Sequence, residues 1–425
     1  MALAQRSDSP PSSFHADKTN VPAVSMVTTL FFMWGFLTSL NDILIPHLKT
    51  IFQLNYKQAF LIQVFFFVSY FVFSLPSGRI VDTFGYKKSM VGGLLTMALG
   101  AILFLPAASA PSFALFLVAL AVLAAGMTIL QVSANPYVAV LGPENTAASR
   151  LNLAQAFNSL GTFIGPAVGG LLILSAAPLA DSALRQLSPE AWRAYQISQA
   201  SSVKLPYLGF ALVLAGLAVA IALFKLPHIP GVERSGAKVS DSIWRHKHLV
   251  LGAIAIFVYV GAEVAIGSFL VNYFNEADIG NVSEKVAAGL VSFYWGGAMV
   301  GRFIGSGLQQ KIAPNKILGV CAIMAALLVC ATMLTFGHVA MWTVIAVGLF
   351  NSIMFPTIFT LSIEGLGPLT GDGSSLLVAA IVGGAVIPLA QAAIADRIGI
   401  HHAFILPIVC YIYIAFFAFR GYRRA

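Results

Sequence analysis

The chain contains 425 residues, of which 58% are hydrophobic and 9% are charged, and its formal net charge is +8. Soluble domains carry about 25% charged residues, so this composition excludes a soluble globular protein and indicates that a lipid bilayer surrounds most of the chain. No basic cluster alternates with base-stacking aromatic residues, so the positive charge does not indicate nucleic-acid binding.

Long apolar runs follow one another along the chain. A membrane span requires about 20 apolar residues in a helix. Backbone groups in lipid must form hydrogen bonds internally, so these runs predict helices. In the first half we predict helices over residues 21–48, 60–75, 90–107, 113–140, 151–174 and 205–226. In the second half we predict helices over residues 248–274, 286–308, 317–336, 339–363, 374–395 and 402–419.

The pattern predicts an all-α polytopic membrane protein with twelve transmembrane helices in two six-helix halves. Residues 1–20 are expected to form a cytoplasmic tail, because they lack an apolar signal core. The halves are expected over 21–226 and 248–425, joined by a cytoplasmic linker at 227–247 that is rich in Gly, Pro, Ser and charge. Lys and Arg concentrate in the segments on the side of the termini, so both termini are expected in the cytoplasm.

The segment between the second and third predicted helices is rich in glycine and charge. It reads Gly78-Arg79-Ile80-Val81-Asp82-Thr83-Phe84-Gly85-Tyr86-Lys87-Lys88, and a degenerate copy occupies residues 307–316 at the equivalent place in the second half. It resembles the loop signature of the major facilitator superfamily, in which the acidic residue is thought to hold the two halves together in one state. We assign to this gating motif Gly78, Asp82, Gly85, Lys87, Lys88 and Arg302.

Longer strings resemble a narrower family, the fucose/glucose/galactose–proton symporters. They are Leu40-Asn41-Asp42-Ile43-Leu44, residues 133–144, residues 150–159 and Phe355-Pro356-Thr357-Ile358-Phe359. The fucose symporter carries an acidic residue where this chain has Gln131, and a glutamine where this chain has Glu263. The second carboxylate has therefore moved between halves, which favours the glucose/galactose branch. The resemblance implies a monomer in a bacterial inner membrane.

Two carboxylates within the predicted helices are candidates for cation coupling and for contact with sugar. Charged groups are costly in a membrane and are functional candidates by default. Asp42 has Thr38 one turn earlier on its face of the helix, and Glu263 has Tyr259 one turn earlier. Each carboxylate could instead serve a structural role, at a helix end or between helices. Two carboxylates, one in each half, could carry a proton or hold sodium, and the sequence leaves this choice open.

Neutral polar and aromatic residues supply further candidates for binding sugar. Amide groups both donate to and accept from sugar hydroxyls, and aromatic rings stack on the apolar face of a pyranose. The candidates are Thr38, Gln131, Asn135, Gln155, Asn158, Trp295, Asn351 and Phe355. The alternative is hydrogen bonding or packing between helices.

The expected function is secondary active import of a monosaccharide, a hexose such as glucose or galactose, by cation symport with alternating access. Proton coupling is favoured; sodium coupling and facilitative uniport are the alternatives. A sugar sensor, a drug exporter and an intramembrane enzyme are disfavoured, because the chain shows no output domain, no nucleophile motif and no metal cluster. We expect no cofactor and no metal beyond the coupling ion, and the lipid bilayer and the sugar as the partners.

Overall fold

The computed structural model describes residues 18–52, 54, 56–109, 111–173, 186–228 and 242–424. Most of the predicted tail and of the predicted linker lies outside these ranges. The described chain is helical and contains no strand. The first group of helices comprises α1 (Val21–Phe52), α2 (Tyr56–Ser109), α3 (Phe113–Val140), α4 (Ala147–Ile173), α6 (Pro189–Ser201) and α7 (Lys204–Leu223).

The second group begins after the linker. It comprises α8 (Lys247–Asn275), α9 (Glu284–Leu308), α10 (Pro314–Leu334), α11 (Gly337–Asn351), α12 (Met354–Ile363), α13 (Thr370–Ala379), α14 (Gly383–Ile398), α15 (Ile400–Ala403) and α16 (Ile405–Phe416). Each of the twelve predicted segments falls on one or two of these helices. The extra helix α6 was not predicted, because its sequence is polar and amphipathic rather than apolar.

One long helix, α2, covers the second and third predicted segments. Its helical hydrogen bonding continues past Gly78, and the direction changes at Gly85, where φ is 77° and ψ is 168°. Residues with side chains rarely adopt this left-handed region, so glycine suits this position. The gating motif is therefore mostly helical, with its turn confined to Gly85.

Two predicted helices of the second group are broken. The tenth divides into α11 and α12 around Ser352, and the eleventh divides into α13 and α14 at the 3-10 turn Ala380–Val382. A break at membrane depth is tolerated where the backbone is buried in protein. The whole of α12 meets this condition, because all its residues are buried.

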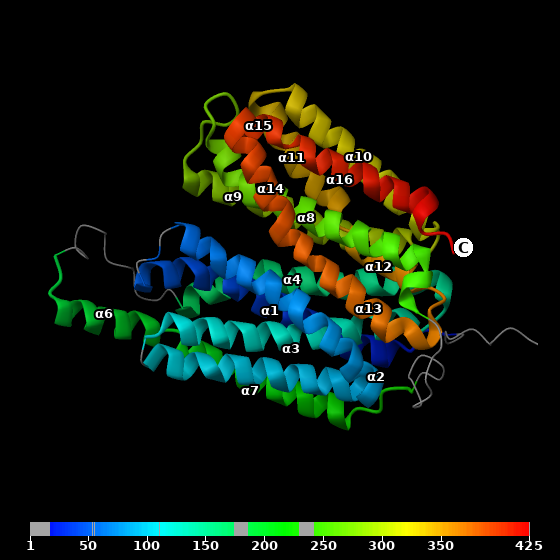
Figure 1. The fold of residues 1–425 in the computed structure, drawn as a ribbon, viewed down its shortest axis with the longest axis horizontal. Helices are drawn as coiled ribbons and strands as arrows, with labels where there is room; N and C mark the ends of the chain where they lie inside the picture. The colour runs from blue at the N-terminus through cyan, green and yellow to red at the C-terminus, as the bar shows by residue number, and fades with distance from the viewer. Residues whose placement is uncertain are drawn as a thin grey trace, which may run out of the picture.

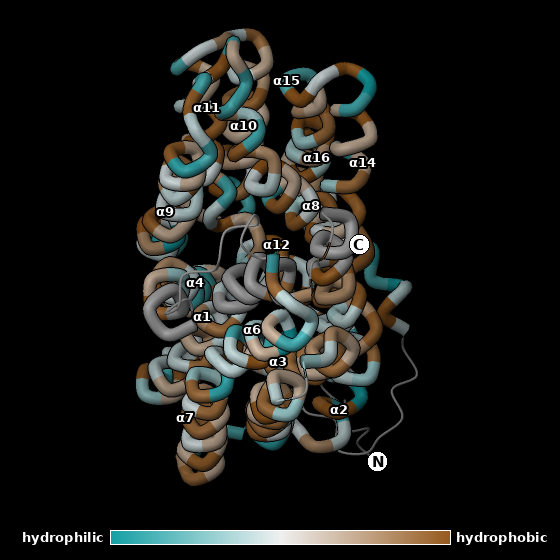
Figure 2. Tube along the Cα trace, turned by 90° about the vertical axis from the view of Figure 1, so that its left-hand side faces the viewer, coloured by the Kyte–Doolittle hydropathy of each residue, from teal (hydrophilic) through white to brown (hydrophobic). Residues whose placement is uncertain are grey.

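Nine helical segments of the described chain are long and apolar enough to cross a membrane. One of them, Val64–Ser109, covers two predicted spans, whereas α4 and α9 are not among the nine. Figure 1 shows the two groups of helices closest together near the C-terminus. The contacts between groups there join α2 to α13 and α4 to α9. Figure 2 shows hydrophobic residues along the helices of both groups, and large apolar side chains such as Leu212 of α7 and Val320 of α10 are exposed.

Candidate functional site

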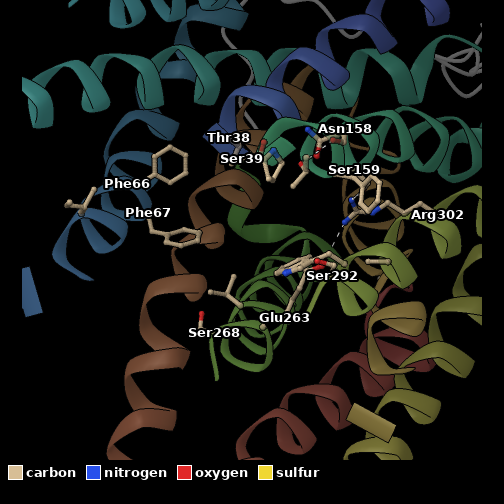
Figure 3. Close-up of a pocket in the computed structure, with 18 of the residues that line it drawn as sticks. Thr38, Ser39, Phe66, Phe67, Asn158, Ser159, Glu263, Ser268, Ser292 and Arg302 are labelled. Atoms are coloured by element: carbon tan, nitrogen blue, oxygen red, sulfur yellow. Dashed lines mark hydrogen bonds and ion pairs between the residues drawn. The ribbon is translucent and has the colours of Figure 1, made fainter. Parts of the chain in front are cut away.

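A cavity of about 650 Å³ lies between the two groups of helices. Helices α1, α2 and α4 of the first group face α8 and α9 of the second across it (Figure 3). Its polar lining residues are Thr38, Ser39, Asn158, Ser159, Thr162, Glu263, Ser268, Ser292 and Arg302. Its aromatic lining residues are Phe66, Phe67, Phe163 and Trp295. Mixed polar and aromatic surfaces of this kind suit a small polar molecule with an apolar face.

Glu263 is the described carboxylate that lines this cavity. The Tyr259 hydroxyl donates a hydrogen bond to Glu263 Oε1 at 2.7 Å. The Tyr294 hydroxyl donates to the Glu263 backbone carbonyl at 3.2 Å. The two tyrosines therefore hold the α8 backbone and the carboxylate in place. Among the described residues no hydrogen bond to the second oxygen is found, and Oε1 itself keeps acceptor capacity beside Tyr259.

Arg302 lies beside this carboxylate. Its Nη2 is 3.9 Å from Glu263 Oε1, and both side chains are 13% exposed. Its Nε donates to the carbonyl of Ser352 at 2.9 Å, where α11 ends. Its Nη1 donates to the hydroxyl of Ser159 in the first group. The guanidinium therefore connects the two groups of helices at the cavity wall.

The indole of Trp295 forms the aromatic wall beside these charges and is 39% exposed. A side chain at Gly267 would meet this ring, because a Cβ built there lies 2.9 Å from Trp295 Cζ2. The absence of that side chain lets the indole lie against α8. Figure 3 shows Phe66 and Phe67 on the side of the cavity opposite Arg302.

Of the predicted sugar ligands, Thr38, Asn158, Glu263 and Trp295 line the cavity. Thr38 Oγ1 donates to the Trp34 carbonyl at 2.9 Å, and Asn158 Nδ2 donates to the Phe31 carbonyl at 2.9 Å. Asp42 lies in α1, but its side chain is outside the described part of the structure. Its predicted role in coupling therefore remains a prediction.

The other predicted ligands are buried behind the cavity in this conformation: Gln131, Asn135, Gln155, Asn351 and Phe355. Gln131 Nε2 donates to the Tyr70 hydroxyl at 3.0 Å, and Gln155 Nε2 donates to Asn135 Oδ1 at 3.2 Å. These amides support the cavity wall of the first group by hydrogen bonds to one another and to tyrosine.

An equivalent pair lies in the second group. Asn351 Nδ2 donates to the Tyr294 hydroxyl at 2.8 Å. Each half thus pairs an amide of its fourth membrane segment with a tyrosine of its second, which extends the weak repeat seen in the sequence. Phe355 packs against Phe359, with ring centroids 6.0 Å apart, rather than facing the cavity.

Neutral hydrogen bonds close the end of the molecule that carries the C-terminus. Ser149 Oγ donates to the Ser306 carbonyl at 2.7 Å, and Ser306 Oγ donates to the Ser149 carbonyl at 3.0 Å. Further along, Asn152 Nδ2 of α4 donates at 2.5 Å to Oε1 of Gln309, the residue that follows the end of α9. All four side chains are buried. This seam between α4 and α9 separates the cavity from that end.

An ion cluster lies at the rim of the same end. The Arg424 guanidinium contacts Glu144 of the first group at 2.7 Å and also pairs with Glu364 of the second. Both contacts are substantially exposed to solvent. Arg424 therefore links the two groups at their surface, as the serines do in the interior.

The gating motif lies against α13. Gly78 packs on Ser375, whose hydroxyl donates to the Ser74 carbonyl at 2.9 Å. Asp82 Oδ1 packs against Gly371 and occupies the space that a Cβ at this position would fill. The first-group carboxylate thus faces the first turn of a second-group helix, where the helix dipole favours negative charge.

Gly85 makes the turn that follows, and Lys87 and Lys88 come after it at the start of the next helical segment. Lys88 is exposed, and Lys87 is partly exposed. Arg302, which we grouped with this motif, lies instead in the cavity wall. The hydrogen bond to the Ser352 carbonyl orients the Arg302 side chain. The two residues belong to different segments, so sequence spacing does not show this contact.

Sequence reasoning missed the small hydroxyls Ser268 and Ser292 of the cavity wall. Ser159, by contrast, belongs to the polar face that contains Gln155 and Thr162, and its helical spacing indicated it. Among the described residues, no group of three His, Cys, Asp or Glu side chains is placed to hold a metal ion.

Comparison with known proteins identifies close relatives. Residues 27–381 match the family model of the Major Facilitator Superfamily. The chain is 54% identical to a glucose/galactose transporter of Brucella abortus, over 94% of both chains. It is 37% identical to an L-fucose-proton symporter of Escherichia coli, over 93% of this chain and 92% of that protein.

A crystal structure of the transporter FucP in the outward conformation has the same fold. Its TM-score is 0.89 at 36% identity, covering 96% of this chain and 99% of that chain. The family model covers most of the sequence, and the relatives match nearly end to end. The chain therefore belongs to the Major Facilitator Superfamily.

Proposed function

We propose that this protein imports a hexose, glucose or galactose, by symport with protons. As a member of the Major Facilitator Superfamily it is a membrane transporter rather than an enzyme. The observation that carries the choice of substrate is the 54% identity, over nearly the whole of both chains, to a glucose/galactose transporter. The choice of the proton as the coupling ion is supported by the 37% identity to an L-fucose-proton symporter.

The cavity is consistent with a hexose. Its volume of about 650 Å³ accommodates one sugar with its water, and Trp295 offers an aromatic face beside hydrogen-bonding groups from both halves. A charged group in a membrane interior marks a substrate or ion pathway. We assign cation coupling to Asp42 and Glu263, one carboxylate in each half.

The same proposal places the protein as a monomer in a bacterial inner membrane, with both termini in the cytoplasm. The closed seam between α4 and α9 then faces the cytoplasm, and the cavity is reached from outside. The likeness to FucP in its outward conformation supports this assignment.

Uptake of labelled glucose into proteoliposomes tests the proposal, first under an inward proton gradient and then under an inward sodium gradient. The wild type should accumulate glucose above equilibrium with protons. Asp42→Asn and Glu263→Gln should lose accumulation while keeping counterflow, the exchange of labelled for unlabelled sugar. Glu276→Gln is the matched control, because Glu276 is exposed at the end of α8.

Three outcomes contradict parts of the proposal. Accumulation with sodium alone would replace the proton by sodium. Equilibration with no response to either gradient would make the protein a uniporter. Absence of any glucose or galactose transport would overturn the substrate assignment.

A further inference from the structure

The spacing of Glu263 and Arg302 differs from that of a closed ion pair. Hydrogen-bonded ion pairs have N···O distances of about 2.7–2.9 Å, whereas Nη2 and Oε1 here are 3.9 Å apart. Both groups line the cavity, and Figure 3 shows them on the same side of it. The two opposite charges therefore both face the cavity without forming a hydrogen-bonded ion pair.

The arginine cannot close this gap by a simple shift, because its other nitrogens are held. Nε donates to the Ser352 carbonyl at 2.9 Å. Nη1 donates to the Ser159 hydroxyl and lies 3.5 Å from the Gln155 carbonyl. The contact that the described residues give to Nη2 is the one with Glu263. A planar guanidinium fixed at two nitrogens presents the third in a set direction.

The carboxylate is fixed in a similar way. Tyr259 donates to Oε1 at 2.7 Å and uses one of its acceptor positions. A carboxylate offers about four such positions. Glu263 therefore keeps acceptor capacity toward the cavity, and Arg302 keeps donor capacity beside it.

A single hydroxyl group fits between the two charges. A hydroxyl oxygen that accepts from Nη2 at about 2.9 Å and donates to Oε1 at about 2.7 Å encloses an angle of about 90° between the two bonds. A hydroxyl has one donor and two acceptor lone pairs, so it can make both bonds at once. An amide or an aliphatic group does not combine these two properties on one atom.

We propose that Arg302 and Glu263 together bind one hydroxyl group of the sugar, with Arg302 donating to its oxygen and Glu263 accepting its proton in a hydrogen bond. This inference rests on the proposed function, since it assigns a contact within hexose binding. It makes Arg302 a residue that determines specificity and moves it from the gating motif to the substrate site.

The test compares glucose with its 2-, 3-, 4- and 6-deoxy analogues, each missing one hydroxyl. Apparent affinity is measured by competition with labelled glucose in counterflow, for wild type, Arg302→Gln, Glu263→Gln and Lys311→Gln. Lys311 is exposed beyond the end of α9 and serves as the control for loss of a positive charge. Arg302→Lys keeps the charge without the planar fork and replaces Arg302→Gln if that variant does not fold.

In the wild type, one deoxy analogue should bind about tenfold to one-hundredfold more weakly than glucose, as expected for lost hydrogen bonds to charged groups. That ratio should fall to near one in both Arg302→Gln and Glu263→Gln, while the other three ratios stay unchanged. Lys311→Gln should retain every wild-type ratio.

A purely structural arginine gives a different pattern. If Arg302 only joins α9 to α4, its loss weakens all sugars equally and leaves every ratio as in the wild type, which would overturn the inference. Failure of the proposed function is recognised separately, because the wild type would then bind neither glucose nor galactose.

Discussion

Single residues decide the shape of the cavity wall, and Gly267 is a clear case. The glycine leaves room for the Trp295 indole, which would otherwise lie 2.9 Å from a new Cβ. Trp295 lines the cavity and is half-exposed. It lies on α9, the helix that also carries Arg302. The position of the ring thus depends on a residue that contributes no side chain.

Gly267→Val should displace the indole and weaken sugar binding. We expect an increase of about fivefold to tenfold in the glucose concentration for half-maximal counterflow, corresponding to loss of about 1–1.4 kcal/mol of aromatic contact. Gly296→Val is the matched control, because a Cβ at Gly296 meets nothing within 4 Å. Equal half-maximal concentrations in the two variants would show that the ring does not contact sugar.

The sequence predicted Glu263 in the cavity wall because a carboxylate in an apolar helix has few other roles. It did not predict that Gln131 and Asn351 lie one layer deeper, since helical spacing gives the face of a residue and not its depth. Arg302 was assigned to the gating motif and not to the cavity wall. Its contacts with Ser352 and Ser159 join segments far apart in the chain.

At the scale of elements, Arg150 shows how a helix end is stabilised inside the protein. Its buried guanidinium donates to the carbonyls of Ala139, Gly142 and Pro143, where α3 ends and the chain turns into α4. The last carbonyls of a helix have no partner within it. A single arginine therefore satisfies groups that would otherwise be buried without hydrogen bonds.

Arg150→Gln should destabilise the fold by about 3 kcal/mol, because it leaves several buried carbonyls unpaired. Arg150→Lys should recover only part of this loss, since a compact ammonium does not span the same carbonyls. Thermal unfolding can be followed with a thiol-reactive dye, because Cys321, Cys330 and Cys410 are free and at least partly buried. Unchanged melting of Arg150→Gln would show that water replaces the arginine there.

The membrane segments themselves were predictable, because hydropathy alone identifies stretches of about 20 apolar residues. The breaks within them were not predicted. The interruption around Ser352 nevertheless has a cause in the sequence, because Pro356, four residues later, has no N–H to donate to the Ser352 carbonyl. Arg302 Nε donates to that carbonyl instead. The turn of the gating motif was expected from its glycines, yet only Gly85 has a positive φ.

For the whole molecule, we expect the rim cluster to couple closure of this end to pH. Burial raises the pKa of the Glu364 carboxyl in this closed end; Arg424 opposes this shift, and the nearby Glu144 adds to it. His248 Nε2 also contacts the Glu364 backbone carbonyl at 3.0 Å. When the end opens, water surrounds Glu364 and its pKa returns toward its ordinary value. We therefore expect the closed form to bind the proton more tightly.

Acidification on that side should therefore favour the closed end. As the pH falls through the raised pKa of Glu364, the closed population should increase, and the increase should level off below the ordinary pKa. The distance between spin labels attached on either side of the rim measures this population. Glu364→Gln should remove the pH response, and Glu276→Gln should keep it. Opening on acidification would mean that the open end, and not the closed one, binds the proton more tightly.

The hydrogen bonds of Arg302 to the first group of helices affect the rate of the transport cycle. The bonds to Ser159 and to the α4 backbone join the two groups of helices, so they must break or be rebuilt each time the protein reorients. A bound hydroxyl that shares the guanidinium offers replacement hydrogen bonds during that movement. The loaded carrier should then return faster than the empty one, and sugar on the far side of the membrane should accelerate efflux.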